Sequence, residues 1–307
     1  MSTHTHPRPA PSTPPALAPS RTLETAAYLL AALAAVGAAA GLLTGGGPGP
    51  HGVETLRGAT VTLYGEGLYR YDTWLVGAGN RGQDLVVLLV EVPLLLAAVR
   101  WHRRGGPVAA AALTGVLAFF AYFYVSMVFA TAQNRLFPVY VAAAGLAGFG
   151  LAALAARVDV RRVAASLPGR PSRRALTTYL LGLAGALTLA WLPGVLATAA
   201  TGDIAEVVGP YTSEVTVALD LGLVVPVVVI AAVQLLRRQP VGAALTFVLL
   251  VMNVCIGVLL MGQGVAQLVS GVPMTAGEIV AKMLTFAVLT LVAGGLLARM
   301  AAAARRT

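Results

Sequence analysis

The stretch 82–107, GQDLVVLLVEVPLLLAAVRWHRRGGP, decides the fold. It starts with Asp84, continues as an apolar segment that carries Glu91 and Pro93, and ends in a basic cluster. An apolar segment with arginines at one end is typical of a membrane-spanning helix whose basic end lies in the cytoplasm. A carboxylic acid within such a segment is costly to insert, so it is expected to face protein or water. Glu91 is therefore a candidate functional residue.

Residues 214–241, EVTVALDLGLVVPVVVIAAVQLLRRQPV, carry the same landmarks in the same order: an acid (Asp220), a proline (Pro226), an AAV triplet, a double arginine and a Pro-Val. The neighbouring segments agree, because Tyr-Leu-Leu starts at Tyr28 and again at Tyr179, and Ala-Ala-Leu-Thr occupies both 111–114 and 243–246. These landmarks favour two four-helix halves in the same orientation, related by an axis along the membrane normal. Chance similarity between helices rich in Ala, Leu and Val is the alternative.

The composition is that of a membrane protein. Hydrophobic residues make up 58% of the 307 residues and charged residues only 11%, whereas soluble proteins carry roughly 25% charged residues. The net charge of +9 comes from short loops between apolar segments, where arginines set orientation, so nucleic-acid binding is not expected. A single cysteine, Cys255, excludes a disulfide within one chain. Neither a metal site nor a cofactor motif is recognisable: no histidine lies within a span, and HExxH, GxSxG and Walker motifs are absent from the sequence.

The apolar segments predict an all-α membrane protein with eight transmembrane helices, each near the ~20 residues that a bilayer requires. The expected domains are a disordered cytoplasmic tail (1–22), a first four-helix half (23–157) that includes an outer loop (44–83), a basic cytoplasmic linker (158–174), a second half (175–300) and a short tail (301–307). In the outer loop, residues 60–72 alternate and break at 65–67, which predicts a small extracytoplasmic β-hairpin. Residues 73–82 are expected to form a short interfacial helix before a second span at 84–99. The eight predicted spans are 23–43, 84–99, 108–131, 139–156, 175–199, 217–236, 241–261 and 279–300.

The arginines predict the orientation. With both termini in the cytoplasm, sixteen of the twenty-one basic residues fall in cytoplasmic segments, as the positive-inside rule requires. Four fall outside (Arg57, Arg70, Arg81 and Arg135), and Lys282 lies near the start of the last span. The dominance of arginine over lysine and the abundance of alanine are typical of a bacterial protein from a high-GC genome. We therefore expect a multi-pass protein of the bacterial plasma membrane.

Three ionisable residues, Glu91, Asp220 and Lys282, lie within predicted spans, and all three are expected near the outer ends of their helices. Our hypothesis is an outer-half pocket in which Glu91 and Asp220, at corresponding places of the two halves, bind a cationic group or a proton. The other candidate ligand-binding residues are Tyr122, Tyr124, Asp84, Asn253 and Lys282. The alternative is structural: Lys282 would pair with Glu278 one turn away, and the acids would hydrogen-bond to neighbouring helices.

Several of these stretches resemble a family of bacterial polytopic membrane proteins with no assigned function. The similar segments are YGEGLYRYD, GQDLVVLLVEVPLL, YFYVSM with NRLFPVYV, and ALDLGLVVPVVV with LLRRQPVG, and together they cover most of residues 58–262. The resemblance implies an integral membrane fold and no particular activity.

Three functions remain open on the sequence. The leading hypothesis is a transporter or solute-binding membrane protein for a small solute or cation. The first alternative is a non-catalytic assembly or sensory partner that docks another protein through its outer loop, with Tyr64, Tyr69 and Tyr71 as candidate docking residues. The second is an enzyme on a lipid-like substrate, with Asp84 and Glu91 as acid and base.

Overall fold

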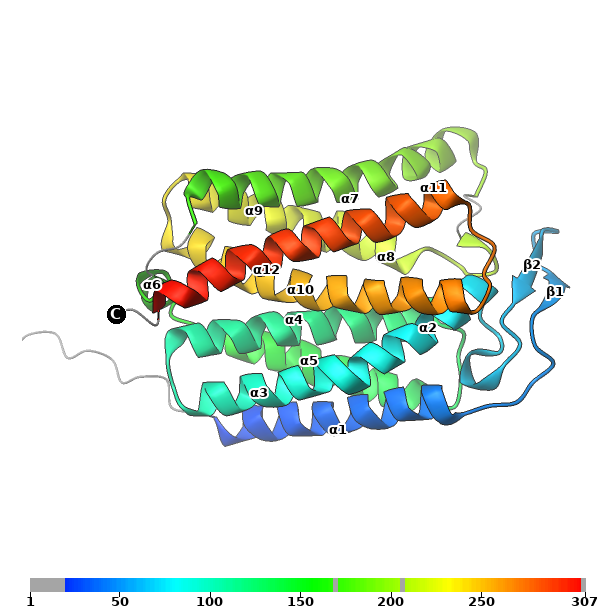
Figure 1. Ribbon diagram of the computed structural model, residues 1–307, viewed down its shortest axis with the longest axis horizontal. Helices are drawn as coiled ribbons and strands as arrows, with labels where there is room; N and C mark the ends of the chain where they lie inside the picture. Colours follow the sequence, from blue (N-terminus) through cyan, green and yellow to red (C-terminus); the bar gives the residue numbers. More distant parts are fainter. Residues whose placement is uncertain (1–19, 168–170, 205–207, 305–307) are drawn as a thin grey trace, which may run out of the picture.

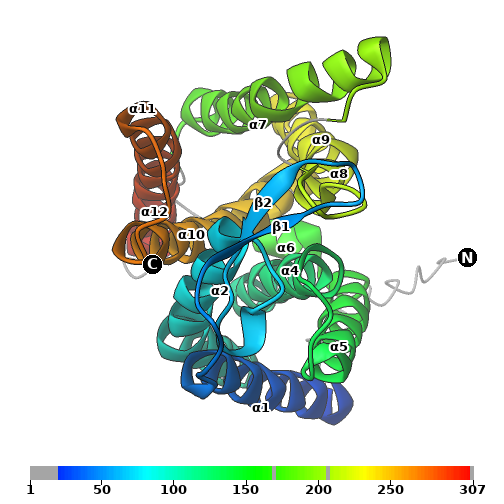
Figure 2. The same ribbon diagram turned by 90° about the vertical axis from the view of Figure 1, so that its right-hand side faces the viewer.

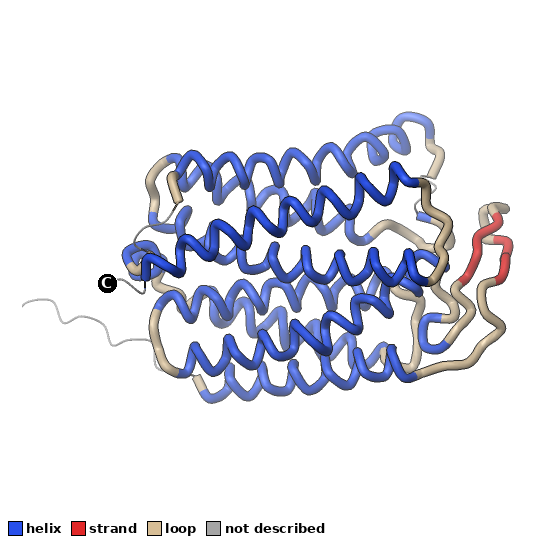
Figure 3. The backbone as a smooth tube through the Cα atoms, in the orientation of Figure 1, coloured by secondary structure: helices blue, strands red, loops and turns tan. Residues whose placement is uncertain are grey.

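The computed structural model describes residues 20–167, 171–204 and 208–304, and it is a bundle of long helices lying side by side (Figures 1 and 3). Most of the predicted N-terminal tail and the last three residues lie outside this description. The last two residues of the predicted tail, Arg21 and Thr22, belong to the first helix. At the other end of the chain, the last helix continues to Ala304. A two-stranded sheet lies at one end of the bundle. We call this end the hairpin end, and the opposite end, which carries the arginine-rich turns, the arginine end.

The elements follow one another in this order: α1 (Arg21–Leu43), β1 (His51–Glu54), β2 (Thr60–Leu63), η1 (Gly67–Tyr69), α2 (Trp74–Val86), η2 (Val87–Glu91), α3 (Val92–Arg103), α4 (Pro107–Ala130), α5 (Phe137–Ala155), α6 (Val160–Ala165), α7 (Arg173–Thr201), α8 (Val215–Leu219), η4 (Asp220–Val224), α9 (Val225–Leu236), α10 (Pro240–Val269), α11 (Ala276–Ile279), η5 (Val280–Leu284) and α12 (Thr285–Ala304). The elements η2, η4 and η5 are π-helical turns inside longer helices.

Seven helices within the described residues are long and apolar enough to cross a membrane. They are Arg21–Leu43, Trp74–Arg103, Pro107–Ala130, Phe137–Ala155, Arg173–Thr201, Val215–Leu236 and Pro240–Val269. The eighth predicted span is represented by a shorter apolar helix, Thr285–Met300, which follows η5. Large apolar side chains such as Phe149 and Leu189 point outward, with 82% and 76% of their surface exposed. A helical surface of this kind suits lipid rather than water, so the protein is a membrane protein.

The helices form two groups, which Figure 2 shows from the hairpin end. In one group α1, the α2–α3 helix, α4 and α5 surround a core, and in the other α7, the α8–α9 helix, α10 and α12 surround a second core. Helix α10 joins the groups, because it packs against α2 and α4 as well as against α9 and α12.

Glycines allow α2 and α10 to pack closely where the two groups meet. A Cβ added at Gly82 would overlap the carbonyl oxygen of Gly262, and one added at Gly262 would overlap the side chain of Val86. Small residues at a contact let helix backbones approach within a membrane. Beside this contact, Gln83 Nε2 donates a 2.7 Å hydrogen bond to Gln263 Oε1. The crossing is therefore held by close packing and by a polar bond.

The second span begins earlier than the sequence indicated. Residues 73–82 do not form a separate interfacial helix; Thr73 caps one continuous helix from Trp74 to Arg103 by accepting a hydrogen bond from the Val76 amide. The glycines in this segment lower helix propensity. Packing of Gly79 and Gly82 against α10 overrides that propensity.

The hairpin also differs from the prediction. Strand β2 pairs with the earlier strand β1, with His51 opposite Leu63 and Glu54 opposite Thr60. The glycine of the connecting turn is Gly58, whose φ is 78°. Gly65 and Gly67 do not form a hairpin turn; they have positive φ because their backbones pass against Gly49 and Thr44, where a Cβ would overlap.

Candidate functional site

Glu91 is a buried carboxyl group in the middle of the membrane-spanning part of the bundle. It is the last residue of η2, has no exposed surface, and neither carboxyl oxygen has a hydrogen-bond partner among the described residues. The thiol of Cys255 on α10 lies beside the carboxyl group and is a weak donor to it, although the contact falls short of full hydrogen-bond geometry. A buried carboxylate with no stronger donor is costly. A bound proton or cation would supply the missing partner.

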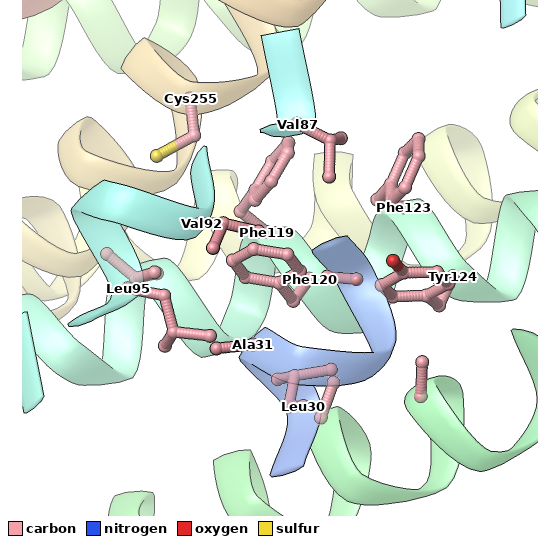
Figure 4. Close-up of a cluster of buried hydrophobic side chains, with 14 of the residues drawn as sticks. Leu30, Ala31, Val87, Val92, Leu95, Phe119, Phe120, Phe123, Tyr124 and Cys255 are labelled. Carbon is pink, nitrogen blue, oxygen red and sulfur yellow. The ribbon is translucent and has the colours of Figure 1, made fainter. Parts of the chain in front are cut away.

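Apolar and aromatic side chains pack beside the turn that ends in Glu91. In Figure 4, Val87 and Val92 lie near Phe119 and Phe120 of α4, and Cys255 of α10 lies beside this cluster. Phe119 packs edge-on against Phe120 with ring centroids 5.1 Å apart. A π-helical turn leaves backbone groups out of the regular α-helical ladder and is frequent at functional sites. The proline that follows η2, Pro93, also lacks a backbone donor.

Asp220 has the opposite environment, because both of its oxygens accept hydrogen bonds. Tyr122 Oη of α4 donates to Oδ1 at 3.0 Å, and Trp191 Nε1 of α7 donates to Oδ2 at 2.9 Å. The carboxyl group thus joins α7 and the α8–α9 helix to α4 of the other group. This arrangement agrees with the structural alternative for Asp220, which is that the acid hydrogen-bonds neighbouring helices.

Replacing Trp191 with Phe tests this junction. We expect the free energy of unfolding to fall by about 1–3 kcal/mol, because a buried carboxylate oxygen loses its donor. Thermal unfolding in detergent measures the change, and Trp101→Phe serves as a control because Trp101 is 45% exposed. Equal melting temperatures for the two variants would contradict a structural role for the Trp191–Asp220 bond.

Asp84 belongs to a third cluster, near the hairpin end. Tyr69 Oη donates a 2.7 Å hydrogen bond to Asp84 Oδ2 and lies 3.5 Å from Tyr140 Oη. Gly41 of α1 leaves the space that these groups fill, since a Cβ there would overlap the Asp84 carboxyl. Burial, the negative charge of Asp84 and the neighbouring Tyr140 raise the pKa of Tyr69 well above its usual value. Tyr69 is therefore a buried donor.

The three acids belong to separate clusters. Asp84 lies seven residues, or roughly 10 Å of helix, from Glu91 toward the hairpin end. The donors to Asp220 are Tyr122 and Trp191, whereas the donor to Asp84 is Tyr69. The structure thus brings each acid together with its own partners, not with the other acids.

The remaining predicted residues have separate positions. Tyr124 is buried in the aromatic core, 4.9 Å from Phe123 between ring centroids, and Asn253 donates a hydrogen bond to Tyr179 Oη. Lys282 is in η5, and its side chain lies outside the described part of the chain.

The predicted docking tyrosines also differ from one another. Tyr64 is buried and accepts a hydrogen bond from Arg81, and Tyr69 is buried as described above. Tyr71 is 64% exposed, with the Arg70 guanidinium 5.9 Å from its ring centroid. Burial therefore leaves Tyr71 as the docking candidate of the three.

A buried acid that the sequence did not single out, Asp72, holds the loops of the hairpin end together. Its Oδ1 accepts hydrogen bonds from the Ala132 amide at 2.7 Å and from Tyr211 Oη at 2.9 Å, whereas Oδ2 has no partner among the described residues. Arg57 donates to the carbonyl oxygens of Gly209 and Tyr211. These bonds join the loop after β2, the turn after α4 and the loop before α8. We call this set of contacts the loop junction.

Burial raises the pKa of Asp72 from 3.8 to about 7, although the Ala132 and Tyr211 bonds lower it. The folded protein then binds a proton more tightly than the unfolded chain, so stability is highest at low pH and is lost as pH rises from about 4 to 7. Between pH 5 and pH 8 we expect a loss of about 2–3 kcal/mol. Asp72→Asn is expected to flatten this dependence in thermal unfolding. The exposed Asp203→Asn is the control, and an unchanged slope in Asp72→Asn would disprove the assignment.

Five residues of these clusters were missed by sequence reasoning: Asp72, Tyr140, Trp191, Tyr211 and Cys255. Tyr140 and Asp72 lie in the resemblance segments NRLFPVYV and YGEGLYRYD, so those segments pointed to them. The partner of Tyr211, Asp72, is 139 residues away in the chain, and that of Trp191, Asp220, lies on the next helix, 29 residues away; no local pattern indicates either.

Within the described residues, no group of three or more His, Cys, Asp or Glu side chains could hold a metal ion. Comparisons with protein-family models, with curated proteins and with solved structures found no match for this chain.

Proposed function

We propose that this protein is a membrane transporter that couples solute movement to a proton or a small cation, with Glu91 as the coupling residue. The observation that carries the proposal is the buried Glu91 carboxyl group, which lacks a hydrogen-bond partner in the described structure and lies within a π-helical turn. Intramembrane carboxyl groups of this kind are typical of proton relays in pumps and transporters. Asp220, a second ion-binding residue in the sequence-based hypothesis, has a different role in this proposal: it holds helices together and does not bind the ion.

We infer that the chain has eight spans in two parallel four-helix repeats, on the following observations. In both halves a π-helical turn begins six residues before a proline, at Val87 before Pro93 and at Asp220 before Pro226. The next helix in each half begins on a proline, Pro107 or Pro240. Transporters built from such repeats place their sites between the repeats and move one repeat against the other. Here α10, which carries Cys255 beside Glu91, is the helix that packs against both groups.

We assign the arginine end to the cytoplasm of a bacterial cell and the hairpin end to the outer side. Arg100, Arg103 and Arg104 cluster at the arginine end, and the positive-inside rule favours this orientation. Segment α11–η5–α12 is the eighth span in this topology, which returns the chain to the cytoplasmic side.

The test is ion movement in lipid vesicles. The purified protein is reconstituted with a pH-sensitive dye inside, and panels of amino acids, sugars and organic cations are added outside. The proposal expects a solute-dependent pH change that Glu91→Gln abolishes. Solute-dependent pH changes of equal size in both proteins would exclude Glu91 as the coupling residue.

Docking of a partner protein at the hairpin end is the second candidate function. Leu56, in the turn between β1 and β2, is fully exposed, and Tyr71 is 64% exposed on the same side. Exposed apolar and aromatic side chains are frequent at interfaces. If docking is the function, Leu56→Ser with Tyr71→Ser abolishes partner binding, whereas Glu91→Gln leaves it intact.

A further inference from the structure

A cavity at the arginine end, about 260 Å³ in volume, is surrounded by cations. It lies where α6, α7, α9 and α10 end or begin, and three arginines line it: Arg161, Arg173 and Arg238. The other lining residues are neutral. Asp159, two residues before Arg161 in the sequence, pairs with Arg162 and caps α6.

None of the three lining arginines forms an ion pair within the residues that the structure describes. Three guanidinium groups around one cavity repel one another, and this repulsion is stronger at a membrane surface than in bulk water. An anion in the cavity would remove it. Guanidinium groups match phosphate in particular, because their planar forks donate paired hydrogen bonds to its oxygens.

Helix α10 adds to the positive potential. It begins at Pro240 beside the cavity, and its N-cap residue, Gln239, makes no side-chain capping bond. The first amide groups of a helix carry partial positive charge and favour anions. Helix α10 is 30 residues long, so its first turn carries the partial positive charge of a long helix.

The backbone at Arg238 indicates that its side chain matters. Arg238 has a φ of 61°, in the left-handed region that favours glycine. It ends α9 in a Schellman motif, with Arg238 N–H donating to the Leu235 carbonyl and Gln239 N–H donating to the Gln234 carbonyl. Glycine is usual at this position, so an arginine there accepts backbone strain and places a guanidinium group at the cavity.

We propose that this cavity binds a phosphate group, supplied by an anionic phospholipid headgroup or by a free phosphate. The position favours the lipid, because the cavity lies at the ends of membrane-spanning helices, at the depth of headgroups. Leu235 and Ala243 supply apolar lining beside the arginines, and basic pockets between helices at the cytoplasmic side suit anionic headgroups. The site is independent of Glu91 and of the proposed transport activity.

The test compares melting temperatures of the full-length protein in nanodiscs. Discs of phosphatidylcholine alone are compared with discs that also contain phosphatidylglycerol, and inorganic phosphate is added to the first set in a separate arm. We expect phosphatidylglycerol to raise the melting temperature. In Arg173→Gln/Arg238→Gln the apparent affinity for phosphatidylglycerol should fall about 10- to 30-fold, since each arginine near an anionic surface contributes on the order of 1 kcal/mol.

The matched control is Arg174→Gln/Arg237→Gln, which removes the same charge from the neighbouring positions that do not line the cavity. This control should keep the wild-type response. A single variant, Arg238→Gly, guards against misfolding: its melting temperature in phosphatidylcholine should equal or exceed that of the wild type, while its response to phosphatidylglycerol shrinks.

The outcomes separate the sources. Stabilisation by inorganic phosphate in phosphatidylcholine discs, lost in the cavity variant, assigns the site to free phosphate. Stabilisation by phosphatidylglycerol alone, lost in the same variant, assigns it to the lipid. Equal loss in the cavity variant and its control, or no stabilisation by either probe, overturns the proposal.

Discussion

Glu91→Leu is expected to abolish ion-coupled flux and at the same time to raise thermal stability. Flux is lost because the variant has no group that can take up a proton or a cation. Stability rises because an apolar side chain replaces a buried carboxyl group that has no hydrogen-bond partner among the described residues. A buried polar group without a hydrogen-bond partner costs about 1–3 kcal/mol, and an apolar side chain removes this cost. Vesicle flux and thermal unfolding in the same lipid measure the two effects.

The opposite signs of these two effects separate a functional acid from a structural one. A structural acid would lose stability on substitution, as we expect when Asp220 loses its donor from Trp191. Glu54→Gln is the matched control, because Glu54 is exposed on β1, and it should change neither quantity. A fall in melting temperature for Glu91→Leu would show that Glu91 has a stabilising partner and would remove the basis of the proposed role.

Gly82→Leu is expected to prevent the two helix groups from packing. The new side chain would overlap the Gly262 backbone and the Ala266 side chain at the crossing of α2 and α10. Backbone atoms cannot move aside as a flexible side chain can, so the helices must separate. Overpacking costs typically 1–3 kcal/mol and occasionally more, and separation also breaks the bond between Gln83 and Gln263. We expect loss of the folded, monodisperse protein in size-exclusion chromatography.

Gly145→Leu is the control for this substitution. Gly145 is also in a membrane-spanning helix, α5, but a Cβ there meets no atom within 4 Å. The same change should leave the protein folded, because leucine has the higher helix propensity and suits lipid. If Gly82→Leu folds as well as Gly145→Leu, the close crossing of α2 and α10 is not required for the fold.

The helices themselves could be predicted from the sequence because their cause is local. A bilayer forces each apolar segment to satisfy its backbone hydrogen bonds internally, so a run of about 20 apolar residues becomes a helix wherever it occurs. The spans at 23–43 and 217–236 match α1 and the α8–α9 helix to within two residues. Boundaries failed where packing overrides propensity, as at Trp74, where the span starts well before Asp84.

The hairpin shows what a local pattern does not reveal. Alternation in residues 60–72 predicted a turn at 65–67, whereas β2 pairs with β1 across a turn that contains Gly58. Gly65 and Gly67 instead pack against the backbone of the loop 44–49. Residues 63–73 nevertheless fold back, because Leu63 forms an isolated antiparallel β-bridge with Thr73.

The sequence by itself determined that this chain is a helical membrane protein and that acids lie within its spans, because hydrophobic length and the cost of burying charge are properties of single segments. Only the tertiary structure decided what each acid does. Asp220 meets Tyr122 and Trp191, which come from α4 and α7, whereas the Glu91 carboxyl group has the weakly donating Cys255 thiol beside it and no full hydrogen bond in the described structure. The difference arises from which helices face each other, and such facing depends on packing between separate helices, including the glycine contact of α2 with α10.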